Sequence, residues 1–192
     1  MRFPGERDLL DERAAVLVTL ASLTDDEFES GPTLCSDWSP RDVLAHLVGI
    51  DGSLGEYVRA KGNIARANAE IVERARSRPR DELMASAERW ATRPPLGSRS
   101  SALFLLGDTA IHHQDILRGA GRTRDVPAPC RAAILREGLV LGPHRLLRYR
   151  VVPDDGGRPM GRGAVVRGSS EALGMWLAGR TAVESDLVFV QL

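Results

Sequence analysis

The chain has 192 residues, enough for one domain with a sizeable core or for a domain with a small appendage. Its 26 basic and 26 acidic side chains cancel, so its charge favours neither a nucleic-acid-binding nor a membrane-binding protein. The sequence does not begin with a secretory signal, and no apolar run approaches the roughly 20 residues of a membrane span, so we expect a cytoplasmic protein. Its two cysteines form no CxxC pattern, and we expect them to be reduced thiols.

The first third of the sequence predicts helices with clear start signals. Residues 6–23 carry apolar side chains at helical spacing, and residues 24–27 add a short helical turn. A Ser-Gly-Pro break at 30–32 opens a loop that holds Cys35 and Trp38. Ser39 then offers an N-cap, Pro40 suits the first helical position, and Asp42 completes a capping box. The helix that follows carries His46 in or beside its apolar stripe.

The sequence pattern in the middle of the chain also predicts helices. Residues 63–76 and 80–90 predict two further helices, and residues 92–97 predict a loop. An apolar run then begins near Ala102 and stops at Gly119 and Gly121, which indicates one helix with a glycine stop. Residues 127–142 predict another helix.

After residue 143 the sequence pattern changes from mainly helical to a mixture of strands and helix. Residues 146–152, 163–167 and 186–192 read as strands, and a Ser-capped helix runs from 169 to 179. The pattern predicts a mainly α protein, with a four-helix bundle over residues 1–143 and a small C-terminal α+β region over residues 144–192.

Three side chains form a candidate metal site. Asp108 and His112 lie four residues apart, so on a helix they share a face and can present lone pairs to one divalent metal. His46, on a second helix of the bundle, supplies a third ligand if the two helices face each other. Three ligands leave a position open, which is typical of catalytic zinc, and iron or nickel also fit these donors. Alternatively, the Asp and His form only a hydrogen-bonded pair or part of a solvated face, and His46 is a satisfied core histidine.

Several neighbouring residues allow two interpretations. His113 lies about 100° round the helix from His112 and is either a packing residue or the true ligand. Asp115 either orients a ligand imidazole or pairs with Arg118. We expect Trp38 to pack beneath the capped helix.

Other candidates have weaker signals. We expect Cys35 to be a small buried residue, with redox chemistry as the second possibility. We expect His144 to be a solvent-exposed residue of a turn. Arg145, Arg148 and Arg180 are basic residues that can meet an anionic substrate or cofactor.

Two motifs resemble those of a known family. Trp38-Ser39 through Asp42 to His46 is similar to a "W-[ST]-x-x-D-x-x-x-H" signature, and Asp108 through His112 to Asp115 is similar to an "[ED]-x-x-x-H-x-x-D" helix. Residues 167–180 resemble a weaker C-terminal "V-x-G-x-x-x-x-L…L-x-G-R" element. Together they resemble the DinB/YfiT-like metal-binding bundles and, within these, the mycothiol-dependent maleylpyruvate isomerase family.

The resemblance implies that His46, Asp108 and His112 bind a divalent metal, most often zinc, and that the metal works with mycothiol, the thiol of actinobacteria. The implied enzyme is an isomerase or thiol S-transferase that acts on a small electrophile. We expect a monomer or a homodimer. Because those isomerases carry Glu where this chain has Asp108, a non-catalytic metal- or ligand-binding protein with a stress or regulatory role is the alternative. A bundle whose histidines only satisfy core hydrogen bonds is the third possibility.

Overall fold

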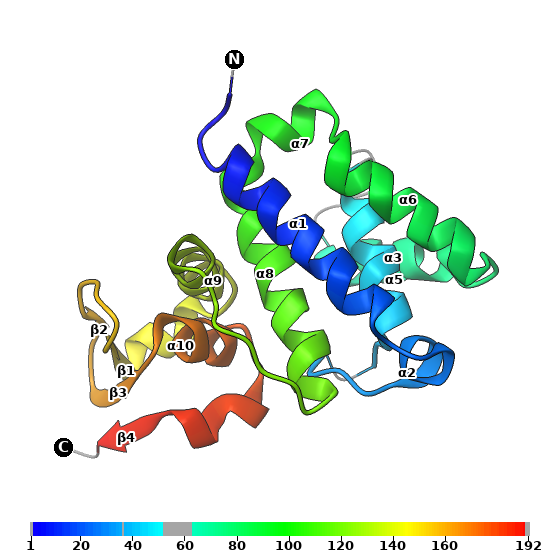
Figure 1. Cartoon of the computed structure of the whole chain (residues 1–192). Coiled ribbons are helices and arrows are strands. Elements are labelled where there is room, and N and C mark those ends of the chain that lie inside the picture. The colour runs from blue at the N-terminus through cyan, green and yellow to red at the C-terminus, as the bar shows by residue number, and fades with distance from the viewer. Residues whose placement is uncertain (1, 36, 52–62, 191–192) are drawn as a thin grey trace. The chain divides into compact units, whose positions relative to one another are not determined.

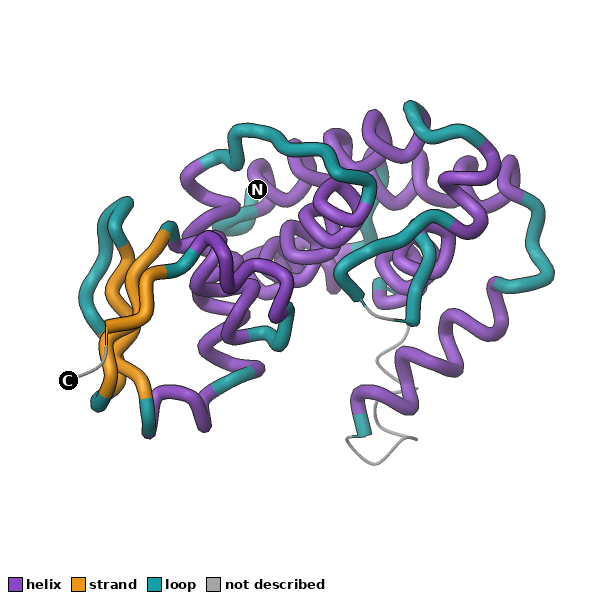
Figure 2. The backbone as a smooth tube through the Cα atoms, turned by 90° about the horizontal axis from the view of Figure 1, so that it is seen from below, coloured by secondary structure: helices purple, strands orange, loops and turns teal. Residues whose placement is uncertain are grey.

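The computed structural model describes residues 2–35, 37–51 and 63–190, and these are mainly helical with a small C-terminal sheet, as predicted (Figures 1 and 2). Two compact units make up the chain. The first contains Met1–Ala102 and His112–Thr123, and the second contains Leu103–Ile111 and Arg124–Leu192. Among the described helices, none combines the length and apolarity that crossing a bilayer requires. The predicted domain boundary at residue 143 stays a prediction.

The first unit is a helical bundle. Its elements are α1 (Glu6–Ala21), α2 (Asp25–Ser30), α3 (Pro40–Ile50), α5 (Ile64–Ala75), α6 (Arg80–Thr92), α7 (Leu96–Ser100) and the second half of α8 (Ala102–Gly119). The predicted helices over residues 6–23, 63–76 and 80–90 and the glycine stop of α8 are confirmed. The loop predicted over residues 92–97 is wrong at its end, because α7 begins at Leu96, directly after Pro95 holds the backbone extended.

The core of this unit draws apolar side chains from α1, α2, α3, α5, α6 and α8. Each side chain of this kind contributes about 1.5–3 kcal/mol when fully buried. Its largest members, all at most 4 % exposed, are Leu20, Leu23, Phe28, Leu44, Leu47, Leu83, Trp90 and Ile116.

A buried ion pair fixes the end of α3. The Arg13 guanidinium, fully buried in α1, donates from Nη1 and Nη2 to the two carboxylate oxygens of Asp51 at 2.8 and 2.7 Å. It also donates to the Trp90 carbonyl at 2.9 Å and lies 4.4 Å from the centroid of the Trp90 ring. Because bidentate geometry restricts both partners, α1, α6 and the C-terminal end of α3 are held in register.

A second buried polar group joins α1 to α8. His113 Nδ1 lies 2.8 Å from Glu12 Oε1, and His113 Nε2 lies 2.8 Å from Thr19 Oγ1. Glu12 and His113 are 2 % and 1 % exposed. Glu12 and Thr19 are two helical turns apart on α1, so both ring nitrogens of His113 face that helix.

The last turn of α8 touches the loop between α2 and α3. A Cβ placed on Gly119 would lie 2.2 Å from the Pro32 carbonyl oxygen and 2.5 Å from the Thr33 Cα. These are backbone atoms, so no side-chain rotation can relieve the contact. Glycine at this position therefore allows the loop to lie directly against α8.

The second unit joins helices to a four-stranded sheet. After the first half of α8, its elements are α9 (Ala128–Leu141), η1 (Pro143–Leu147), β1 (Tyr149–Pro153), β2 (Met160–Gly161), β3 (Ala164–Gly168), α10 (Ser170–Leu177), η2 (Thr181–Asp186) and β4 (Val188–Val190). The strand order is β2-β1-β3-β4, with β1 and β3 parallel and both outer strands antiparallel to their neighbours.

The helices of this unit pack closely on each other. A Cβ on Gly138 would meet the Gly174 carbonyl oxygen at 2.2 Å, so α9 and α10 approach at their backbones. The Ser169 cap of α10 is confirmed. The strand predicted over residues 146–152 begins later, because residues 143–147 form a 3₁₀ helix that starts at Pro143. Residues 191–192 of the predicted last strand lie outside the described residues.

We predict that Gly119→Ala lowers the free energy of unfolding by about 1–3 kcal/mol, because the added methyl group overpacks a backbone contact. Gly97→Ala is the matched control, since a Cβ there meets nothing within 4 Å. Urea unfolding followed by circular dichroism measures both. Equal stability of Gly119→Ala and the wild type would show that the loop is not held against α8.

Candidate metal centre

The N-terminal cap of α3 sets the position of His46. The Ser39 hydroxyl accepts from the Asp42 N–H at 3.4 Å, and the Asp42 carboxylate accepts from the Ser39 N–H at 3.2 Å, which confirms the predicted capping box. Pro40 occupies the first turn. With its start fixed in this way, α3 buries His46 to 1 % exposure beside the core.

The helix α8 carries the other candidate ligands. Asp108 precedes His112 by one turn, as predicted from their spacing. The His112 side chain is 8 % exposed, and Asp108 is half-buried. The His46 and His112 rings lie edge to face, with their centroids 4.9 Å apart and their planes at 70°. Potential ligand atoms of His46, Asp108 and His112 all lie within 4.8 Å of one another.

These donors fit a divalent metal. Two imidazoles and one carboxylate are the ligand types of catalytic zinc sites, and three ligands leave room for a further one. Whether they bind a metal stays a prediction.

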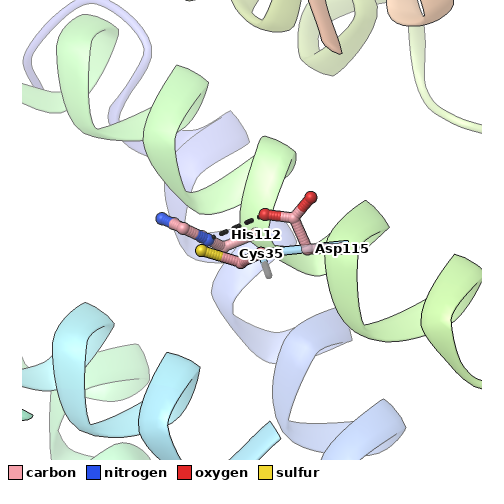
Figure 3. A group of neighbouring side chains, drawn as sticks. All are labelled: Cys35, His112 and Asp115. Carbon is pink, nitrogen blue, oxygen red and sulfur yellow. Dashed lines mark ion pairs between the residues drawn. The ribbon is translucent and has the colours of Figure 1, made fainter. Parts of the chain in front are cut away.

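Asp115 pairs with His112. Its Oδ2 lies 3.0 Å from His112 Nδ1, and its side chain is fully buried (Figure 3). The structure therefore supports the first of the two interpretations of Asp115, a carboxylate that orients a ligand imidazole. With Nδ1 held by Asp115, the other ring nitrogen, Nε2, points away from the carboxylate (Figure 3).

Trp38 has a larger role than the sequence predicted. We expected it only to pack beneath α3, and it does lie against the core of the first unit. Its ring also lies 5.0 Å from the His46 ring and is stacked on the His112 ring at 5.7 Å, centroid to centroid. The indole therefore contacts both candidate ligands and limits how far their rings can rotate. Its place in the same motif as His46 was the only sequence signal.

His113 points elsewhere. Both of its ring nitrogens lie 2.8 Å from acceptor or donor oxygens of α1, those of Glu12 and Thr19. Its interpretation as a packing residue is thus favoured over its interpretation as the metal ligand.

The loop before α3 brings Cys35 to the same helix. The Leu34 N–H donates to the Asp115 carbonyl at 3.1 Å, and the Cys35 N–H donates to the Thr33 hydroxyl at 3.1 Å. Thr33 in turn donates to the Trp38 carbonyl at 2.7 Å. Cys35 is half-buried and remains a thiol, as does the buried Cys130.

Two of the basic candidates, Arg145 and Arg148, line a cavity of the second unit. A cavity of about 460 Å³ is lined by His144, Arg145, Arg148, Tyr149, Trp176, Glu184 and Phe189. The Arg145 guanidinium lies over the Trp176 ring at 4.4 Å. His144 is exposed, as predicted. Arg180 does not line this cavity; it donates to the Ala178 carbonyl at 2.9 Å.

The chain is similar to proteins of one family. Residues 9–88 match the model of the mycothiol maleylpyruvate isomerase N-terminal domain. A solved structure of the mycothiol-dependent maleylpyruvate isomerase superposes with a TM-score of 0.66 at 14 % identity, over 96 % of this chain and 92 % of that chain. A histidine-to-alanine mutant of such an isomerase gives 0.67 at 13 % identity, with the same coverage. No curated protein matches the chain in sequence.

The family match covers the Trp38 to His46 motif and ends before α8, while the structural likeness extends over nearly the whole chain. At 13–14 % identity the structural likeness establishes the fold, and the family match supplies the relationship. The resemblance predicted from the sequence is confirmed: residues 9–88 match the model of the mycothiol maleylpyruvate isomerase N-terminal domain, and the chain has the fold of the isomerase.

Proposed function

We propose that the protein is a metal-dependent, mycothiol-using enzyme that isomerises a small electrophile or conjugates it to the thiol, with zinc as the metal and His46, Asp108 and His112 as its ligands. One observation carries this proposal: two buried imidazoles from α3 and α8 meet beside a carboxylate, with ligand atoms within 4.8 Å. The match of residues 9–88 to the mycothiol maleylpyruvate isomerase N-terminal domain supports mycothiol as the thiol.

The chain's own residues prepare the site for this chemistry. The Asp115 carboxylate lies 3.0 Å from His112 Nδ1, so Nε2 is the ring nitrogen that faces away from it and that a metal would use. Trp38, stacked on the His112 ring and tilted at 43° against the His46 ring, packs against both imidazoles. When bound, a divalent metal lowers the pKa of a coordinated thiol and supplies thiolate at neutral pH.

The reaction then follows from the nucleophile. Addition of the thiolate to one carbon of an activated double bond converts that bond to a single bond, about which the product can rotate. When the C–S bond breaks again and the thiolate leaves, the double bond re-forms as the other geometric isomer, whereas protonation of the neighbouring carbon gives a conjugate. The surrounding residues hold the substrate and decide which of these outcomes prevails.

The alternative is a bundle that binds metal without turnover. The presence of Asp108 favours this alternative. The aspartate side chain is one methylene group shorter than the glutamate of the isomerases, so its carboxylate lies at a different place relative to the metal. Thiol-dependent turnover separates the two functions.

We predict near-stoichiometric zinc, or another divalent metal, in protein purified without an affinity tag. His46→Ala and His112→Ala lose it, because each removes one of three ligands. His144→Ala is the matched control, since that histidine is exposed. Elemental analysis of the folded variants measures the content. Unchanged metal in His46→Ala and His112→Ala would contradict the proposed site.

We predict that Asp115→Asn weakens metal binding by about 10- to 100-fold, as changes to carboxylates that orient ligand imidazoles do. The substitution keeps the size of the side chain, and competition with a chromogenic chelator gives the affinity. Asp155→Asn, which alters the bonds of the Asp155 carboxylate to Ser170 in the second unit, controls for a general loss of stability. Equal affinities of Asp115→Asn and wild type would mean that Asp115 does not orient His112.

We predict that the metal-loaded protein consumes maleylpyruvate or a model electrophile only when mycothiol is present, and that removal of the metal by a chelator abolishes this turnover. Absorbance of the activated double bond follows the reaction. Full metal loading without turnover on any of these compounds would favour the binding protein.

A further inference from the structure

A second group of metal-binding side chains shares His112. Ligand atoms of Cys35, His112 and Asp115 also lie within 4.8 Å of one another, and all three residues belong to the first unit. The imidazole and carboxylate are buried, and the thiol is half-buried. Figure 3 shows the thiol and the carboxylate beside the His112 ring, with Nδ1 directed at Asp115.

The fold places Cys35 in this group. Its loop is anchored to α8 at the neighbouring residue, where the Leu34 N–H donates to the Asp115 carbonyl at 3.1 Å. The Thr33 hydroxyl fixes the Cys35 N–H from the other side at 3.1 Å. Asp115 therefore contributes its backbone to hold the loop and its side chain to hold His112, so the three donors are held together by one residue.

The two groups differ in chemistry. His46, Asp108 and His112 provide only nitrogen and oxygen donors, whereas the second group adds sulfur. A thiolate selects soft cations with filled d shells, such as Cd²⁺ and Cu⁺, more strongly than nitrogen and oxygen donors do. Cation binding at Cys35 breaks its S–H bond, forms a sulfur–metal bond and releases the proton to water.

We propose that Cys35, His112 and Asp115 form a second metal site for thiophilic cations, and that filling it withdraws His112 from the site with His46 and Asp108. A neutral imidazole has one nitrogen with a free lone pair, and the other nitrogen carries the proton. The second group faces Nδ1, so a cation there requires the lone pair on Nδ1 and moves the proton to Nε2. The exclusion, though not the second site itself, rests on the proposed function.

Cadmium titration of the metal-free protein tests the second site. In the wild type we expect a near-ultraviolet sulfur-to-cadmium charge-transfer band that saturates at one equivalent. Cys35→Ser and Cys35→Ala reduce it to background, while Cys130→Ser, the matched control at the other cysteine, keeps it. A wild type without the band, or a band that persists in both Cys35 variants, overturns the proposal.

His46→Ala separates this proposal from the proposed function. The variant lacks a ligand of the first group only, so it keeps the cadmium band even if no zinc binds at His46, Asp108 and His112. Loss of the band in folded His46→Ala overturns a separate second site.

Zinc release tests the exclusion. Cadmium added to the zinc-loaded wild type displaces zinc one for one, as measured with a chromogenic zinc chelator, and displaces none in Cys35→Ser at the same concentration. Simultaneous retention of both metals overturns the exclusion.

Discussion

The contact between the Asp115 carboxylate and His112 Nδ1, 3.0 Å long and fully buried on the carboxylate side, is the constraint on which the site depends. This contact determines that His112 Nδ1 faces Asp115 and that Nε2 points away from that carboxylate. The Asp115 backbone also accepts from Leu34 and so anchors the loop that carries Cys35 and Trp38. Asp115 therefore helps to position the Cys35 thiol and the Trp38 indole through this loop, and the His112 imidazole through its side chain.

Consecutive histidines on α8 serve different purposes because a helix turns by about 100° per residue. His112 meets the ring of His46 on α3, and His113 meets Glu12 and Thr19 on α1. The pairing of His113 fixes the rotation of α8 about its axis, since a buried polar group is costly to leave without its partners. The rotation of α8 in turn determines where His112 points. His113 is thus a positioning residue for the candidate site without touching it.

The sequence was most informative where the signal is local. The Ser39 to Asp42 cap, the glycine end of α8 and the one-turn spacing of Asp108 and His112 depend on neighbours in the chain, and all are present. The contact of the Trp38 ring with two histidine rings and the place of Cys35 beside Asp115 were not predicted. Both follow from the course of a loop held by Thr33 and by its contact with Gly119, which are tertiary contacts without a periodic signature. The short helix α7 was missed because five residues are too few to show a helical period.

Anomalous diffraction at the zinc absorption edge, from crystals of the zinc-loaded protein, tests the central claim most directly. The account predicts one anomalous peak per chain, within about 2.0–2.2 Å of a nitrogen of His46, a nitrogen of His112 and an oxygen of Asp108. A peak at any other group of side chains, or density for His46 and His112 with no peak between them in fully loaded protein, would contradict it.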